Sequence, residues 1–231
     1  MKSVLVIVPA YNEQENIKRV VDNLIQNYPQ YDYVVVNDGS KDDTKKICVE
    51  NGYRLLDLPV NLGLAGGFRG GMKYAYEKGY DYAIQFDADG QHRPEYIEPI
   101  LKKMEEGYDI VIGSRFVTEK KDSSLRMLGS RMISFAIHVT TGTRIKDPTS
   151  GMRMFNRAMI KECAMNINYG PEPDTVSFLM KNGAKVAEVQ VEMDERIAGE
   201  SYLNFVNSIS YMIRMMISIV IIQNFRKRGR R

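Results

Sequence analysis

Short apolar runs alternate with helix-like stretches through the first half of the chain. The runs are about five residues long and rich in β-branched residues, as buried strands are, and they cover residues 4–8, 33–36, 82–86 and 110–112. Residues that start or stop helices bound the stretches between the runs, at 13–27 behind Asn12, 42–51 behind Ser40 and 67–78 before Gly79. This alternation predicts an α/β fold with a mostly parallel sheet.

Polar segments follow three of these runs directly, at residues 9–13 (PAYNE), 37–40 (NDGS) and 87–91 (DADGQ). Ligands of open α/β sheets bind beyond the carboxyl ends of the strands, so we expect the three segments to meet at one binding edge. The glycine spacings of a P-loop and of a dinucleotide-binding turn are both missing from the sequence. This argues against P-loop chemistry and hydride transfer.

Asp87 and Asp89 are the strongest candidates for a metal site. Side chains two residues apart in an extended segment point to the same side, so these two carboxylates can face one point. Mg²⁺ or Mn²⁺ commonly takes only one or two protein carboxylates and completes its shell with substrate phosphate. Gln91 can add or orient a ligand. A solvated turn is the alternative interpretation, and the position behind a buried strand favours the metal site.

Four segments resemble, in sequence order, the motifs of glycosyltransferase family 2: VIVPAYNEQENI, VVVNDGSKDDT, NLGLAGGFRGGMKYA and FDADGQH. Within that family the chain is most similar to the branch of dolichyl-phosphate mannose synthases and bacterial polyprenyl-phosphate glycosyltransferases. The resemblance runs over nearly the whole chain. It implies the GT-A fold, a Rossmann-like, mostly parallel sheet flanked by helices.

The resemblance also implies a donor site in the first half of the chain. The nucleoside would be held by Pro9, Tyr11, Glu13, Val36 and Asp38. The metal ion and the diphosphate would be held by Asp87, Ala88, Asp89 and Gln91. Asn37 stands where the family often has an aspartate, which leaves the choice of base open.

Two arginines and a serine complete the implied donor site. Arg115 follows the run at residues 110–112, where the family has an arginine near the phosphates. The stretch VQVEMDERIAGES resembles an R-x-x-G-x-S signature that closes on the diphosphate, with Arg196 and Ser201 in its first and last positions. Tyr202 stands where the family often has a lysine.

The acceptor side is implied by a predicted helix at residues 125–139. Arg126 and Ser130 lie four residues apart on one helix face and resemble the pair that grips the acceptor phosphate in the lipid-phosphate branch. Arg131 is a third candidate donor. We interpret His138, on the same face, as a packed or solvated histidine, because a phosphate nucleophile needs little deprotonation.

Two later segments supply further candidates. KDPTSGMRMF resembles a family segment that lies against the active site and contributes Asp147, with Thr149 and Ser150. YGPEPD places Glu172 and Asp174 where many inverting relatives carry an acidic residue facing the acceptor. The catalytic set implied by the resemblance is therefore Asp89, Arg115, Asp147, Glu172 and Arg196.

The last part of the chain predicts an amphipathic helix over residues 203–222. Apolar residues recur there at helical spacing: Phe205, Ile209, Met212, Ile213, Met216, Ile217, Val220 and Ile221. Arg214 and the polar residues of the first half favour a helix lying in the membrane interface over one that spans it. A core or dimer helix is the alternative. We divide the chain into a GT-A domain (1–202) and a membrane-associating helix with a basic tail (203–231).

The charge distribution and the cysteine content indicate which partners and which cellular environment suit the protein. The net charge of +3 argues against nucleic-acid binding, but residues 201–231 hold six basic and no acidic side chains, so residues 1–200 carry −3. Such a basic tail suits an anionic membrane surface. Cys48 and Cys163 lie far apart and match no zinc spacing, which fits a reducing, cytosolic setting, and no secretory signal is evident.

These features together predict a peripheral enzyme on the cytoplasmic face of the cell membrane. It would transfer a sugar, with inversion and with Mg²⁺ or Mn²⁺, from a UDP- or GDP-sugar to polyprenyl (undecaprenyl) phosphate, for glycan assembly in the cell envelope. One alternative is sugar transfer to a polysaccharide hydroxyl, with Glu172 or Asp174 as general base. A non-catalytic membrane adaptor and, less favoured, a nucleotidyl transferase are the others. The sugar, the base and self-association stay open.

Overall fold

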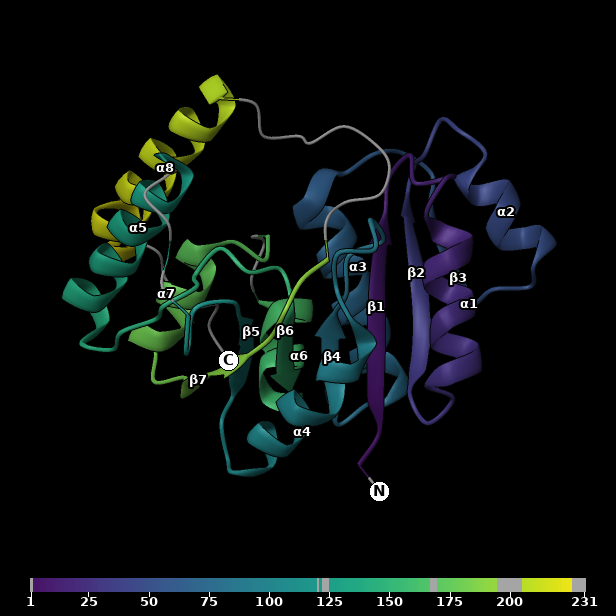
Figure 1. Ribbon diagram of the computed structural model, residues 1–231, viewed down its shortest axis with the longest axis horizontal. Helices are drawn as coiled ribbons and strands as arrows, with labels where there is room; N and C mark the ends of the chain where they lie inside the picture. Colours follow the sequence, from purple (N-terminus) through teal and green to yellow (C-terminus); the bar gives the residue numbers. More distant parts are fainter. Residues whose placement is uncertain (1, 120, 122–124, 167–169, 195–204, 226–231) are drawn as a thin grey trace.

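The computed structural model describes residues 2–119, 121, 125–166, 170–194 and 205–225, without the side chains of residues 125, 126 and 205–209. One sheet runs through these residues in the order β3-β2-β1-β4-β6-β5-β7 (Figure 1). Its strands are β1 (Val4–Ala10), β2 (Asp32–Asp38), β3 (Leu55–Leu58), β4 (Tyr82–Gln85), β5 (Ile110–Ser114), β6 (Arg153–Asn156) and β7 (Val186–Gln190). The α/β prediction is confirmed.

The sheet is parallel except at one strand. β1 pairs in parallel with β2 and β4, β2 with β3, and β5 with β7. β6 lies between β4 and β5 and pairs antiparallel with both. The carboxyl ends of the parallel strands therefore share one edge, which is where the sequence places the polar segments.

Helices cover both faces of the sheet. They are α1 (Ile17–Asn27), α2 (Thr44–Glu50), α3 (Gly63–Lys78), α4 (Ile97–Glu105), α5 (Leu125–Thr141), α6 (Arg157–Met165), α7 (Pro173–Lys181) and α8 (Phe205–Val220), with short 3₁₀ turns η1 (Pro94–Tyr96) and η2 (Ile222–Asn224). Side chains of β1 alternate between two apolar clusters, Leu5 and Ile7 in one and Val4, Val6 and Val8 in the other. Burial on both faces explains why this strand is an unbroken apolar run.

Helix starts differ from the sequence prediction for local reasons. Asn12 has a left-handed φ of 56° and is not the cap of α1, which begins at Ile17 after a turn in which Glu13 O accepts from Asn16 N and Ile17 N. α3 begins four residues earlier than predicted, at Gly63. Its predicted end is confirmed, because Gly79 caps it with a φ of 86°.

α8 packs against α5 and α7 at one end of the sheet, far from α1 and α2 (Figure 1). Met215 and Ile219 are buried on its inner side. Polar contacts also face inward, because Tyr211 Oη donates to Glu172 Oε2 at 2.5 Å and the Ser218 hydroxyl donates to the Asp174 carboxylate. The helix is thus bonded to Glu172 and Asp174, at the start of α7, through polar side chains on its inner side.

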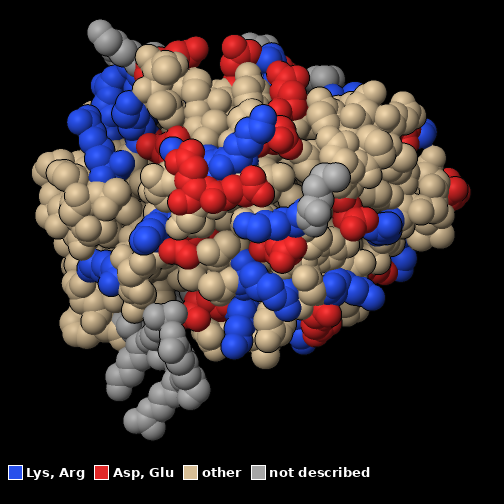
Figure 2. All heavy atoms as spheres, turned by 90° about the horizontal axis from the view of Figure 1, so that it is seen from below, with Lys and Arg blue, Asp and Glu red and all other residues tan. Residues whose placement is uncertain are grey.

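The face at the amino ends of the parallel strands carries mixed charge (Figure 2). Lysines and arginines alternate there with acidic residues, and α4 contributes the pairs Lys102–Glu98 and Lys103–Glu106. Such interspersed charges are typical of a solvated surface and produce no strong field of one sign. Among the described residues, no helix combines the length and the apolar character needed to cross a bilayer.

Gly39 and Gly52 form a matched pair that tests how closely the turn after β2 approaches the backbone of residues 60–61. Both have a left-handed φ, +64° and +65°, but a Cβ on Gly39 would lie 2.5 Å from Asn61 N, whereas one on Gly52 would meet open space. Gly52→Ala should lower the free energy of unfolding by about 1–2 kcal/mol, the usual cost of left-handed backbone at a residue with a side chain. Gly39→Ala should lower it by more, because the backbone at residues 60–61 must also move. Urea denaturation measures both, and equal losses would contradict the close approach.

Candidate active site

The loops after β1 and β2 are tied into one unit at the carboxyl edge of the sheet. Asn12 N donates to Ser40 Oγ at 3.0 Å, and Lys41 N donates to Asn12 Oδ1 at 2.9 Å. Glu13 N donates to Thr44 Oγ1 at 2.8 Å. These bonds explain the left-handed backbone at Asn12, since both its amide and its side chain are used by the neighbouring loop.

The predicted nucleoside residues lie on this unit. Pro9 stands beside Val36 in the sheet register, and Tyr11 follows with an exposed side chain. Glu13 lies in the first loop. Asp38 is buried at the end of β2, and its Oδ1 accepts from Leu62 N at 2.7 Å just before α3 begins. The structure brings these residues to one edge, as the sequence predicts.

Asn37 has a structural reason to differ from the aspartate common in the family. It is buried, and its Nδ2 donates to Asp57 Oδ1 at 2.7 Å while its Oδ1 accepts from Ser40 N at 3.3 Å. An aspartate would have no hydrogen to donate to Asp57. Lys45 lies 2.6 Å from the other oxygen of Asp57, and hydrogen bonding to this lysine holds the pKa of the Asp57 carboxyl below its usual value.

His92 positions the first aspartate of the DADGQ segment. Asp87 N donates to His92 Nδ1 at 2.9 Å, so in the neutral ring Nε2 carries the hydrogen, and it lies 3.7 Å from Asp87 Oδ2. Gln85 Nε2 donates to Asp87 Oδ1 at 3.1 Å. His92 is buried, whereas the Asp87 side chain remains 38% exposed at the edge of the sheet. His92 is not among the residues predicted from the sequence, although it directly follows the segment.

The residues present suit a magnesium or manganese ion that shares its shell with substrate. Ala88 is buried between Asp87 and Asp89, whose side chains are half-buried, and Asp89 Oδ1 accepts from Gln91 N at 3.0 Å. No group of three or more histidine, cysteine or acidic side chains able to hold a metal occurs in the described part of the chain. Two carboxylates match the small protein share that such ions take when a phosphate supplies other ligands.

The segment after β7 runs along this edge. Asp194 N donates to Gln91 O at 2.9 Å, and Gln91 Nε2 donates to Asp194 O at 3.4 Å. Arg93 forms ion pairs with Glu192 at 2.7 Å and with Asp194 at 2.6 Å. Asp194 therefore lies directly beside the DADGQ segment. Arg196 and Ser201 lie outside the described residues.

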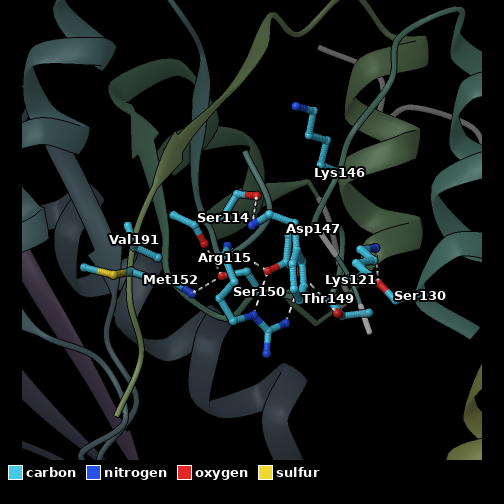
Figure 3. A network of polar contacts seen from close by, with 12 residues as sticks. Ser114, Arg115, Lys121, Ser130, Lys146, Asp147, Thr149, Ser150, Met152 and Val191 are labelled. Carbon is cyan, nitrogen blue, oxygen red and sulfur yellow. Dashed lines mark hydrogen bonds and ion pairs between the residues drawn. The ribbon is translucent and has the colours of Figure 1, made fainter. Parts of the chain in front are cut away.

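Arg115 and Asp147 form a buried ion pair at the centre of the site (Figure 3). Arg115 donates from Nε to Oδ2 at 2.8 Å and from Nη2 to Oδ1 at 2.9 Å, and its backbone N donates to Oδ2 at 3.1 Å. The Asp147 side chain is wholly buried and that of Arg115 is 23% exposed. Burial opposes ionisation, but the hydrogen bonds and charge of Arg115 outweigh it and hold the pKa of Asp147 below its ordinary value.

Residues 147–151 connect this pair to the metal candidates. Thr149 Oγ1 donates to Asp147 Oδ1 at 3.2 Å, and Ser150 Oγ donates to Gly113 O at 2.5 Å. A Cβ on Gly151 would lie 2.7 Å from Asp87 Oδ2, so only glycine fits there without displacing that carboxylate. The loop thus reaches from Arg115 to Asp87.

The acceptor candidates Arg126, Ser130 and Arg131 lie on α5. Ser130 is buried, and its Oγ accepts from Lys121 Nζ at 2.6 Å (Figure 3). Arg131 is exposed, and its Nη2 donates to Lys121 O at 2.7 Å. The side chain of Arg126 lies outside the described residues. Lys121 was missed by the sequence analysis, because no spacing pattern links it to Ser130.

Glu172 and Asp174 are engaged by α8, through Tyr211 and Ser218 as described above. Burial and the neighbouring Glu172 raise the pKa of Tyr211. Arg153, also missed by the sequence analysis, is completely buried and donates to Pro171 O at 2.6 Å and Pro148 O at 2.7 Å. It thereby joins the segment that leads to Glu172 with the segment that starts at Asp147.

Asp147→Asn tests the central ion pair. The change leaves the Arg115 guanidinium without its carboxylate and should lower the free energy of unfolding at pH 7 by about 3 kcal/mol. Asp32→Asn is the matched control, because it breaks an arginine–aspartate pair, with Arg54, in which both side chains are about half exposed. Its cost should stay below about 1 kcal/mol. Urea denaturation measures both, and equal losses would show that the buried pair contributes no more than a surface one.

The same comparison has an expected pH dependence. Because the pKa of Asp147 is lower in the folded protein than in the unfolded chain, its stabilising contribution is complete above the unfolded value of about 3.9. That contribution is lost as the pH falls through the lower folded value. The stability gap between wild type and Asp147→Asn should therefore close at the acid end of a pH series. A gap that stays constant would assign the loss to something other than the charge.

The sequence matches the family model described as "Glycosyl transferase family 2" over residues 5–164. The UDP-N-acetylglucosamine–dolichyl-phosphate N-acetylglucosaminyltransferase of Methanococcus voltae is 31% identical over 215 residues, which cover 83% of this chain and 85% of that protein. The undecaprenyl-phosphate mannosyltransferase of Micrococcus luteus is 30% identical over 214 residues, covering 87% of each chain.

Solved structures of glucosyl-3-phosphoglycerate synthase from Mycobacterium tuberculosis share the fold. The complex with phosphoglyceric acid gives a TM-score of 0.72 at 16% identity and covers 99% of this chain and 82% of that one. The complex with Mn²⁺, uridine diphosphate and phosphoglyceric acid gives 0.70 at 17% identity, covering 96% and 78%. The predictions of GT-A fold and family are confirmed, and this chain belongs to glycosyl transferase family 2 as a glycosyltransferase.

Proposed function

We propose that this glycosyltransferase moves a sugar from a nucleoside diphosphate to polyprenyl phosphate at a membrane surface. The observation that carries the proposal is the placement of two unlike surfaces around the Arg115–Asp147 pair. Residues 147–151 extend from this pair to Asp87, and Asp147 is also the acidic group that acts most on Lys121, which is bonded to Ser130 (Figure 3). Relatives at about 30% identity are named for dolichyl-phosphate, undecaprenyl-phosphate or polyprenol monophosphomannose, which agrees with a lipid-phosphate acceptor.

On the donor side, Pro9, Tyr11, Glu13, Val36 and Asp38 would bind the nucleoside of a UDP- or GDP-sugar. Asp87 and Asp89, with Gln91, would hold Mg²⁺ or Mn²⁺, and the bound ion would neutralise charge on the departing diphosphate. A structural neighbour was solved with Mn²⁺ and uridine diphosphate, which supports this choice of ligands. Arg115 keeps Nη1 outside its bonds to Asp147, and this nitrogen and Arg196 are the proposed cationic donors to the diphosphate.

On the acceptor side, Arg126, Ser130 and Arg131 would bind the lipid phosphate. A phosphate oxygen is already anionic at neutral pH, so it can attack the anomeric carbon without a general base. The new bond would form as the bond to the nucleoside diphosphate breaks on the opposite face of the sugar, which gives inversion. The role of the protein is then mainly to hold the two anionic groups in line.

Transfer to a hydroxyl is less well supported by the contacts of the acidic candidates. A hydroxyl acceptor needs a general base, and the sequence offers Glu172 and Asp174 for that task. Both carboxylates accept hydrogen bonds from α8, Glu172 from Tyr211 and Asp174 from Ser218. Their observed partners fit a role in attaching α8.

A transfer assay tests the reaction and the metal site together. Purified protein in detergent receives undecaprenyl phosphate, Mn²⁺ or Mg²⁺ and a panel of radiolabelled UDP- and GDP-sugars, and product is measured as label in the organic phase. We expect label from one donor, its loss with EDTA, and a fall of at least about 100-fold in Asp89→Asn, because one electrostatic contact to the reacting groups is commonly worth that much.

The control is Glu95→Gln, which changes an exposed carboxylate on η1 near the same edge and should leave transfer unchanged. Label that passes to a soluble glycan instead of the lipid would favour the polysaccharide alternative. An absence of transfer with every donor would favour the non-catalytic adaptor.

We further propose that α5 and α8 form the membrane-facing side of the enzyme, at the cytoplasmic leaflet. The two helices pack side by side (Figure 1), and each carries exposed apolar side chains. On α5 these recur at helical spacing: Leu128, Met132, Phe135 and Val139. On α8 and the residues after it they are Ile213, Ile217, Val220, Ile221, Ile222 and Phe225. The sequence then continues with five basic residues between 226 and 231, which suits an anionic surface.

Vesicle binding tests this surface. Phe135→Glu combined with Ile217→Glu should lower the fraction bound to phosphatidylglycerol-containing vesicles at least about tenfold, because the double variant removes two large apolar groups from the interface. Val49→Glu is the control, since Val49 is 62% exposed, close to the 67% of Phe135, but lies on α2 at the other end of the sheet (Figure 1). Flotation of the vesicles measures binding. Equal binding by the double variant and the control would contradict the assignment.

A further inference from the structure

Lys121 is a half-buried lysine with no carboxylate within ion-pair distance among the described residues. Its Nζ donates to Ser130 Oγ and lies 5.2 Å from the centroid of the Phe116 ring. By contrast, Lys18, Lys45 and Lys103 each place Nζ 2.6 Å from a carboxylate oxygen. Removing an ammonium from water without an opposite charge is unfavourable, and burial lowers the pKa of Lys121.

The nearby acidic group that acts most on Lys121 is already engaged. This group is Asp147, and Arg115 bonds both of its oxygens. Arg131 adds another cation beside Lys121 through its bond to Lys121 O. Glu188, the other carboxylate that acts on Lys121, accepts hydrogen bonds from Lys146 N and Asp147 N. Cationic groups thus gather beside Ser130, which is the arrangement expected of a site for an anion.

The groove that contains Lys121 has a volume of about 700 Å³. Its walls combine cationic with aromatic side chains, and the members that matter here are Lys121, Arg131, Arg144, Phe116 and Phe135. Glu119 is the single carboxylate among the described residues that line it. Cations beside aromatic rings, of which that of Phe135 is exposed, suit an amphiphile with an anionic head and an apolar chain.

We propose that Lys121 binds the phosphate of the acceptor lipid and selects a phosphorylated lipid over its alcohol. This inference rests on the proposed function and adds a residue to its acceptor site. Ser130 Oγ accepts from Lys121, so its own hydrogen remains available to a phosphate oxygen. The ammonium, this hydroxyl and the Arg131 guanidinium then supply three kinds of donor to the oxygens of one phosphate.

The position of Lys121 favours the acceptor over the donor. It is bonded to α5, whose following turns expose Met132 and Phe135, where an apolar chain can lie. Asp87, the donor-side carboxylate, is approached instead by Gly151, four residues after Asp147. A phosphate held at Lys121 would therefore be that of the lipid.

Binding of farnesyl phosphate, a short soluble polyprenyl phosphate, tests the assignment by isothermal titration calorimetry. Lys121→Met should weaken this binding at least about tenfold, as expected for a lost hydrogen bond to a charged group. Lys121→Arg, which keeps the charge, should stay within about threefold of wild type. Farnesol should bind wild type and Lys121→Met alike, and the KM for undecaprenyl phosphate should rise in Lys121→Met more than kcat falls.

Lys103→Met is the matched control, because Lys103 also lies 5.2 Å from an aromatic centroid, that of Tyr108, but is paired with Glu106 on α4. Its Kd for farnesyl phosphate should equal that of wild type. An unchanged Kd in Lys121→Met would overturn the inference, as would weaker binding of the nucleotide sugar instead. If Lys121→Met and Lys121→Arg bind farnesyl phosphate equally weakly and melt at equally lowered temperatures, Lys121 only stabilises its loop, and the inference is overturned. A wild type that neither binds farnesyl phosphate nor transfers sugar would refute the proposed function itself.

Discussion

The ion pair between Arg115 and Asp147 is the contact on which the geometry of the whole site depends. A carboxylate as deeply buried as that of Asp147 is tolerated only when a cation and hydrogen bonds replace the water it has lost. Arg115 meets that need with a two-pronged contact and its own backbone amide. The end of β5 and residues 147–151, which approach Asp87, are therefore fixed relative to each other.

This arrangement addresses the electrostatic difficulty of the proposed reaction. A lipid phosphate must approach a sugar diphosphate, and two anions repel each other strongly where water is excluded. In the proposed arrangement, Asp87 and Asp89 would hold the metal ion and the diphosphate, and the cationic groove at Lys121 would hold the lipid phosphate, so each anion would have its own place.

α8 departs from the usual amphipathic surface helix. Such a helix turns its apolar side to the core, as α8 does with Met215 and Ile219, but Ile213, Ile217 and Val220 of α8 are also exposed. Ser218 on α8 and Gln223 on η2 are buried and bonded to α7. The polar bonds to α7 hold the helix against the domain without using its whole apolar surface. That surface, together with the exposed stripe of α5, is left available for a lipid interface.

The sequence by itself determined the features that depend on local order. Alternating apolar and helical segments specify an α/β sheet, and residues that follow strands must meet at its carboxyl edge, so Asp38, Asp87 and Asp89 were placed correctly. Tertiary structure alone decided the contacts that join side chains distant in the chain. Asp147 meets Arg115 across 32 residues, and Glu172 meets Tyr211 across 39. Tertiary structure also decided the antiparallel pairing of β6, whose Arg153 is buried, and the hydrogen bond between Lys121 and Ser130. No periodicity encodes such contacts, because they depend on which atoms the folded elements bring within bonding distance.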